Sequence, residues 1–246
     1  MSRFRLFRQT FRGFGLITAH HRARSADRYL ATVLAGVAGC ANAGGFMVLG
    51  DYTSHMTGYL SQLADNIALQ NLTLVLQSAL AILCFVAGAA LSAFAINWAR
   101  TNNPRVQYAL PIAAQGVLFL GFAALGAAGV GQPWLNQTAL GLLCFIMGLQ
   151  NATITKISGA RIRTTHATGM ITDVGIELGK AAYARAAPSA RVAPDFAKLL
   201  LLLQLLGVFL LGGLIGAVGY AHFGFLFSLP LAGMLLAISF PALLKA

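Results

Sequence analysis

Two short phrases place chemically versatile side chains in a chain that is otherwise strongly apolar. They read Ser54-His-Met-Thr-Gly58 and Thr165-His-Ala-Thr-Gly169, one in each half of the sequence. Each follows an apolar stretch with an asparagine near its end, Asn42 in the first half and Asn151 in the second. Imidazole, hydroxyl and amide groups donate and accept hydrogen bonds, and imidazole also titrates near neutral pH. The phrases predict a binding site for a small solute; the simpler role for His55 is a structural hydrogen bond between helices.

The residues before each phrase indicate a break in the chain followed by a new helix. The breaks are Gly50–Thr53 and residues 158–164, and Arg163 adds a positive charge to the second. Suitable N-caps are Thr53 or Ser54 in the first half and Thr164 or Thr165 in the second. The backbone N–H groups of a helix start carry a partial positive charge that favours an anion. The predicted solute-binding residues are Asn42, Ser54, His55, Thr57, Gly58, Asn151, Arg163, Thr165, His166, Thr168 and Gly169.

Each short helix that follows has one polar face. Helical spacing aligns His55, Tyr59, Gln62 and Asn66 in the first, and His166, Met170, Asp173 and Glu177 in the second. Carboxylates on such a face could exchange protons, which nominates Asp51, Asp173 and Glu177 for proton coupling and would also suit a cation. An equally weighted alternative makes Asp173 and Glu177 exposed ion-pair partners of residues such as Lys180 on a cytoplasmic surface helix.

The composition requires a membrane around these elements. Of the 246 residues, 58% are hydrophobic and 9% are charged, a balance that a soluble domain with a solvated surface could not sustain. Six apolar stretches are each long enough to cross about 30 Å of hydrocarbon. They are Leu30–Leu49, Leu72–Trp98, Tyr108–Val130, Trp134–Thr155, Phe196–Tyr220 and Phe223–Leu244. We expect one transmembrane domain over residues 29–246, in which Cys40, Cys84 and Cys144 pack as small apolar residues.

The distribution of positive charge predicts the orientation. The 17 lysines and arginines gather before residue 29, at residues 100–105, 156–163 and 180–198, and at Lys245. If only the six stretches cross, every cluster lies on one side, as the positive-inside rule requires, and both termini are cytoplasmic. Counting residues 54–69 and 165–183 as spans would export the clusters at 100–105 and 156–163, so these segments should be re-entrant or interfacial.

The basic tail of residues 1–28 has its own pattern. Phenylalanines recur at three- and four-residue spacing at Phe4, Phe7, Phe11 and Phe14, with arginines off that stripe. This predicts an amphipathic cytoplasmic helix lying on anionic lipid, and a solvated basic tail is the alternative. Attraction to lipid accounts for the net charge of +11 without a nucleic-acid partner.

The repeated phrases also predict the architecture. Each half, residues 29–130 and 131–246, contains a span, a short helix and two further spans. Three crossings per half turn the second copy upside down relative to the first, so the fold class is an all-α membrane protein of two inverted repeats. Secondary transporters of this kind bind solute near mid-membrane between the halves, at broken helices. Small residues in the first and fifth spans predict close helix packing: Gly36, Cys40, Gly44, Gly212 and Gly216.

The segments around the two phrases resemble a known family. Residues 42–58, the run Gly148-Leu-Gln-Asn-Ala152 and the run Arg163-Thr-Thr-His-Ala-Thr-Gly169 are similar to the YoaK family of bacterial inner-membrane proteins, over nearly the whole chain after Tyr29. His55 and His166 depart from that family's usual residues at these positions. The resemblance implies a bacterial inner-membrane location and a helical membrane fold, and it implies no particular activity.

The leading functional hypothesis is a secondary carrier of a small solute that needs no cofactor. A non-catalytic scaffold or sensor is the alternative, because small-residue faces can also bind other proteins or a second copy of this chain. An intramembrane enzyme is less favoured: the sequence has no G-x-S-x-G, no H-E-x-x-H and no metal-ligand spacing, so we expect neither catalysis nor a metal. No P-loop is present either.

Overall fold

The computed structural model describes residues 24–129, 132–158, 166–189 and 191–244, and these ranges contain helices but no strand. The helices are α2 (Arg24–Leu49), α3 (Met56–Ala68), α4 (Leu72–Asn102), α5 (Ala109–Gly129), α6 (Pro133–Ser158), α7 (Ala167–Ala186), α8 (Phe196–Phe223) and α9 (Ser228–Leu243). Two short 3₁₀ helices, η1 (Pro104–Val106) and η2 (Gly224–Phe227), precede α5 and α9. The amphipathic helix predicted on Phe4, Phe7, Phe11 and Phe14 lies outside the described residues.

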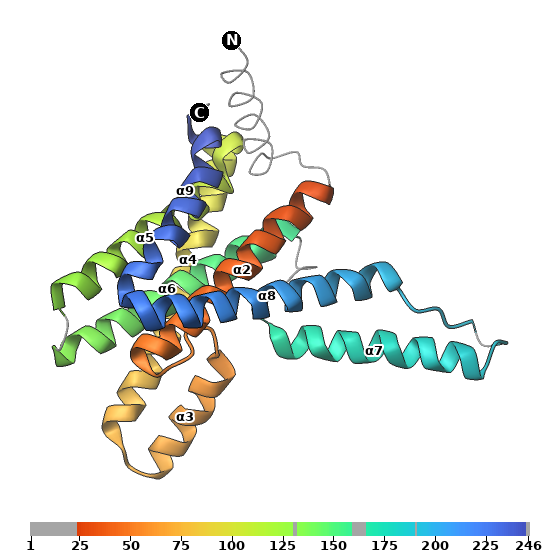
Figure 1. Cartoon of the computed structure of the whole chain (residues 1–246), viewed down its shortest axis with the longest axis horizontal. Coiled ribbons are helices and arrows are strands. Elements are labelled where there is room, and N and C mark those ends of the chain that lie inside the picture. The colour runs from red at the N-terminus through yellow and green to blue at the C-terminus, as the bar shows by residue number, and fades with distance from the viewer. Residues whose placement is uncertain (1–23, 130–131, 159–165, 190, 245–246) are drawn as a thin grey trace.

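Five stretches are long and apolar enough to cross a membrane. They are Arg28–Leu49, Leu72–Asn102, Ala109–Gly129, Trp134–Ile157 and Phe196–Leu243. The last stretch contains both α8 and α9, which meet at a corner where Gly224 has a φ of 52° (Figure 1). The sixth predicted span is therefore the 16-residue helix α9, which is shorter than the others. The short helices α3 and α7 are not among the five stretches.

The most extensive helix pairings join the first half of the chain to the second. Helix α2 packs on α8, α4 on α6, and α5 on α9. Helix α3 contacts mainly α4, and α7 contacts mainly α8, beside which it runs in Figure 1. The same contact pattern thus occurs in both halves. Helix α2 packs on α8 as α6 packs on α4, and α3 packs on α4 as α7 packs on α8.

Glycines bring the backbones together at both of the crossings α2–α8 and α4–α6. A Cβ atom on any of four glycines would collide with a backbone carbonyl of the facing helix. The approaches are Gly39 to Phe209 and Gly212 to Gly36 at the first crossing, and Gly148 to Phe85 and Gly88 to Phe145 at the second. Gly216 lies equally close to Cys40, whose thiol donates to the Gly212 carbonyl at 2.9 Å. The small residues predicted to pack helices therefore do so at the α2–α8 crossing.

Buried side chains fill the space between these crossings, and the large apolar side chains on the outside match a lipid environment. Leu30, Leu34, Phe119 and Phe122 are fully buried, whereas α8 presents a continuous exposed row that includes Leu210, Leu211, Leu214 and Ile215. Exposed leucine is compatible with hydrocarbon, which is the solvent that the apolar stretches require. Hydrogen bonds from buried polar side chains also cross the bundle: Gln150 donates to the Leu34 carbonyl, and Ser92 bonds Thr153 at 2.9 Å.

Candidate functional site

The two phrases meet at one pocket. This pocket has a volume of about 490 Å³ and lies where α3 and α7 begin, and we call it the paired-phrase pocket. Seven of the predicted solute-binding residues line it: Asn42, Ser54, His55, Thr57, His166, Thr168 and Gly169. Its remaining lining residues are Tyr52, Met56, Phe85, Ala167 and Phe209. Its volume is in the range of small-molecule sites in proteins, about 300–1,000 Å³.

A hydrogen-bonded asparagine holds the first phrase against α2. The Asn42 side-chain oxygen accepts from the Ser54 backbone N–H at 3.1 Å and from the Ser54 hydroxyl at 3.0 Å. Because Ser54 is engaged in this way, α3 begins later than predicted, at Met56, with His55 at the N-cap position and no side-chain cap. The prediction that Thr53 or Ser54 caps this helix was therefore wrong: the serine hydroxyl bonds the preceding helix instead.

His55 lies over Gly58 within the first phrase. A Cβ atom on Gly58 would collide with the His55 imidazole, so glycine is what allows the ring to occupy this position. Gly58 itself is not part of the pocket lining, and its role is to support a residue that is. His55 is exposed in the chain, as expected of a side chain at the mouth of a pocket.

The second phrase lines the same pocket with a more open arrangement. Helix α7 begins at Ala167 with His166 at the N-cap position, again without a side-chain cap. The N-cap position is thus not one of the predicted residues Thr164 and Thr165, which lie outside the described residues, as does Arg163. Gly169 has open space where a Cβ would be, so a side chain there would enter the pocket.

Asn151 has the place in the second half of the sequence that Asn42 has in the first. Its side-chain amide donates to the Met147 carbonyl at 3.0 Å, one turn earlier in α6. Asn151 is 7% exposed and is not among the residues that line the pocket. Asn151 thus differs from Asn42 in lying outside the pocket lining.

The three carboxylates proposed for proton coupling lie outside the pocket lining. Asp51 accepts a hydrogen bond from the Gln77 amide at 3.0 Å; burial raises the pKa of Asp51, and this hydrogen bond opposes the rise. Asp173 lies 3.3 Å from the Lys198 ammonium group. Glu177 accepts from the Asp195 backbone N–H at 2.8 Å and from Lys180 at 2.9 Å.

These bonds tie α7 to the start of α8. The hydrogen bond from the Asp195 backbone lowers the pKa of Glu177 most, followed by the hydrogen bond from Lys180. A carboxylate held in this way stays ionised and is a poor carrier of protons at neutral pH. Both carboxylates form ion pairs, as the alternative predicted, but only the Asp173 side chain is partly exposed: Glu177 is 1% exposed and its bonds join two helices.

Phe85 and Phe209 line the pocket, and the sequence reasoning missed them. They lie on α4 and α8, and each has its backbone carbonyl against a glycine of the facing helix, Gly148 or Gly39. A signal was present, because both belong to a repeated Phe-x-x-Gly pattern, Phe85–Gly88 and Phe209–Gly212. What this pattern indicates depends on which helices cross at the phenylalanines and glycines, and the sequence alone does not show those crossings.

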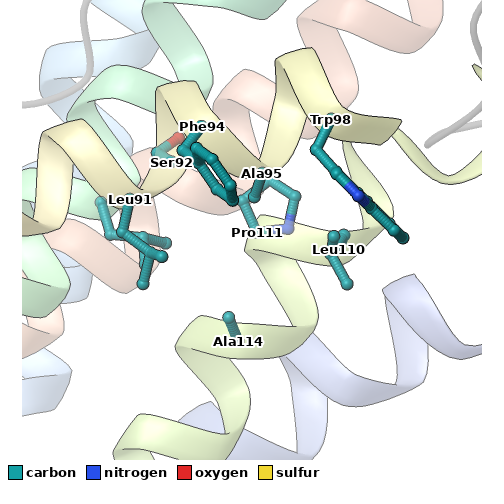
Figure 2. A pocket seen from close by; sticks show the side chains of 9 residues that line it. Leu91, Ser92, Phe94, Ala95, Trp98, Leu110, Pro111 and Ala114 are labelled. Atoms are coloured by element: carbon teal, nitrogen blue, oxygen red, sulfur yellow. The ribbon is translucent and has the colours of Figure 1, made fainter. Parts of the chain in front are cut away.

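A second, apolar groove differs in character from the paired-phrase pocket. It has a volume of about 260 Å³ and lies between α4 and α5 (Figure 2). Leu91, Phe94, Trp98 and Leu110 point into it, and its single hydroxyl, that of Ser92, is bonded to Thr153. It offers no free polar group to a solute, so we place the candidate site in the paired-phrase pocket.

The fold and the apolar stretches define the class of an all-helical membrane protein. A profile of the family described as "Protein of unknown function (DUF1275)" matches residues 30–240, so the chain belongs to that family. The family includes YoaK-like membrane proteins, which confirms the resemblance seen in the sequence. Searches of curated proteins and of solved structures gave no match.

Proposed function

We propose that this protein is a secondary carrier that binds a small solute in the paired-phrase pocket. The observation that carries the proposal is that the two phrases, distant in sequence, line one pocket. A scaffold has no need to bring two polar helix starts together around a cavity in a largely apolar chain. A carrier does, because solute sites between repeats are commonly made by broken helices of this kind.

The repeated contacts support an inverted-repeat architecture for this carrier. The pairing of α2 with α8 corresponds to that of α6 with α4, and the Gly39–Phe209 approach corresponds to the Gly148–Phe85 approach. A two-fold axis that relates the halves would produce matching helix pairs and matching glycine contacts of this kind. We propose six crossings, with α8 and α9 as the last two, a bacterial inner-membrane location and cytoplasmic termini.

The same contacts suggest which parts move. The glycine crossings join the halves through backbone contacts that leave little room for sliding. Helices α3 and α7 each pack mainly on a single partner, α4 or α8, so they can shift with less loss of contact. At the start of α3 this motion breaks the hydrogen bonds from Ser54 to Asn42. In this proposal, α3 and α7 alternately open the pocket to each side of the membrane.

A solute screen in proteoliposomes, with and without a pH gradient, tests the proposal. The structural part is tested with Thr57→Cys and Thr168→Cys in one full-length chain whose native cysteines are replaced. We expect a short bifunctional thiol reagent to join these positions and to stop uptake, because both line the same pocket. Thr57→Cys with Ser189→Cys is the control pair, since Ser189 lies in the exposed α7–α8 connection. Two results together would favour a scaffold or sensor. The protein takes up none of the solutes screened, and substitution of the polar residues in both phrases leaves its cellular role unchanged.

A further inference from the structure

Two phenylalanines form matching apolar walls of the paired-phrase pocket. Phe85 and Phe209 are both half-buried, and they come from α4 and α8, the third helix of each half. Gly148 and Gly39 fix their backbones by close approach to the corresponding carbonyls. The two rings therefore hold equivalent positions on rigid helices, where they can contact the apolar body of a solute.

Most of the other lining residues have polar side chains, the exceptions being Met56, Ala167 and Gly169, and none of them is acidic. His55 and His166 stand at the starts of α3 and α7, followed by Thr57 and Thr168. Neither helix has an acidic residue in its first turn or a side-chain cap. Imidazole N–H and hydroxyl groups can donate to an anion, and the helix starts add partial positive charge.

The carboxylates that could have favoured a cation are engaged elsewhere. Asp51 is bonded by Gln77, and Glu177 is bonded by Lys180 and by the Asp195 backbone. None of the acidic side chains among the described residues lines the pocket. A cation in this pocket would therefore meet two imidazoles and two helix starts with no opposing charge in the lining.

Resting on the proposed carrier function, we propose that the solute is an organic anion with an apolar body. The anionic group binds at His55, His166 and the threonines that follow them, and the apolar body lies against Phe85 and Phe209. The volume of about 490 Å³ leaves room for a ring or a branched chain beside a carboxylate. Very small inorganic anions would leave the aromatic walls uncovered and would bind more weakly.

Three probes separate charge from apolar contact. Phenylacetate and phenethylamine share a ring and differ in the sign of their charge, while acetate keeps the carboxylate and lacks the ring. We expect saturable thermal stabilisation of the purified full-length protein by phenylacetate, and weaker or no stabilisation by the other two. Equal stabilisation by phenethylamine would overturn the assignment of charge, and equal stabilisation by acetate would overturn the role of the apolar walls.

Substitutions locate the binding. We expect Phe85→Ala and Phe209→Ala each to weaken phenylacetate binding roughly tenfold, as the loss of one aromatic contact implies. Phe94→Ala is the matched control on α4, because Phe94 is 67% exposed and faces the separate apolar groove. If an alanine variant does not fold, the corresponding leucine variant keeps an apolar side chain and tests the same loss of ring contact. Unchanged binding in folded variants at both positions would overturn the proposal.

Uptake assays keep this inference distinct from the carrier proposal. Saturable binding of phenylacetate that depends on Phe85 and Phe209, without exchange of radiolabelled phenylacetate across proteoliposomes, would support the ligand class and contradict the carrier. Exchange of phenethylamine or acetate in preference to phenylacetate would support a carrier and overturn the ligand class. Exchange of phenylacetate that the Phe85→Ala and Phe209→Ala changes abolish would support both.

Discussion

Replacing Gly148 with alanine tests the backbone contact that holds Phe85 at the pocket. The added Cβ would meet the Phe85 carbonyl carbon at 2.7 Å and its Cα at 2.9 Å, where ordinary contact starts at 3.4 Å. Neither atom can rotate away, so α4 and α6 must separate by roughly half an ångström or more along this contact. Over-packing of this kind costs about 1–3 kcal/mol.

Gly207→Ala supplies the reference for this substitution. Gly207 lies on α8, and its added Cβ would meet no atom within 4 Å. Both changes gain the same helix propensity of about 1 kcal/mol, so that contribution cancels when the variants are compared. We therefore expect the midpoint of thermal unfolding of Gly148→Ala to lie about 2–12 °C below that of Gly207→Ala.

The measurement is thermal unfolding of both purified full-length variants in one detergent, followed by intrinsic tryptophan fluorescence. Gly39→Ala should behave as Gly148→Ala does, because its Cβ would collide with the Phe209 carbonyl at the matching crossing. Equal midpoints for Gly148→Ala and Gly207→Ala would refute the reasoning, since they would mean that the crossing has room for a methyl group.

Two further predictions concern the first phrase and the α7–α8 connection. Gly58→Ala should lower solute uptake several-fold with little loss of stability, because its Cβ displaces only the His55 ring. Gly179→Ala on α7 has open space, lies outside the pocket lining and should alter uptake less. Equal uptake in the two variants, measured in proteoliposomes, would contradict this. Glu177→Gln should lower the thermal unfolding midpoint at pH 7, because the pKa of Glu177 is lowered in the folded protein and its ionised form is the stabilising one. That difference should shrink as the pH falls from about 4.5, the ordinary pKa of this carboxyl, through the lowered pKa of the folded protein, and a difference that does not shrink with falling pH would show that the hydrogen bonds from Lys180 and the Asp195 backbone are not its cause.

The membrane class and the position of both phrases at one pocket could be predicted from the sequence, because each depends on residue types and their spacing. Long apolar stretches need no knowledge of tertiary contacts, and a repeated phrase such as Ser54–Gly58 indicates a repeated structure. The helix starts were predicted too early by one or two residues, because a serine can cap its own helix or bond a neighbouring one. The choice at Ser54 depended on Asn42, a partner on another helix.

Contacts between distant helices account for the parts that the sequence did not predict. The role of Phe85 depends on which helix crosses α4, and the hydrophobic pattern of a membrane helix carries little information about that choice. Asp173 and Glu177 share a helical face with His166, as predicted, but their partners come from the start of α8. The spacing of residues along one helix predicts which side chains share a face. It does not predict which other helix that face contacts.

The pairing of α2 with α8 also has a consequence for synthesis in the cell. The bond from Cys40 to the Gly212 carbonyl spans 172 residues, so the first transmembrane helix is made long before its main partner. At translation rates of about 5–20 residues per second, the interval is roughly 10–35 s. During that time the glycine-lined face of α2 does not yet have α8 against it, and lipid or the insertion machinery must cover it. We expect a nascent chain that ends before α8 to be recognised as incomplete and degraded, however correctly its first helices have entered the membrane.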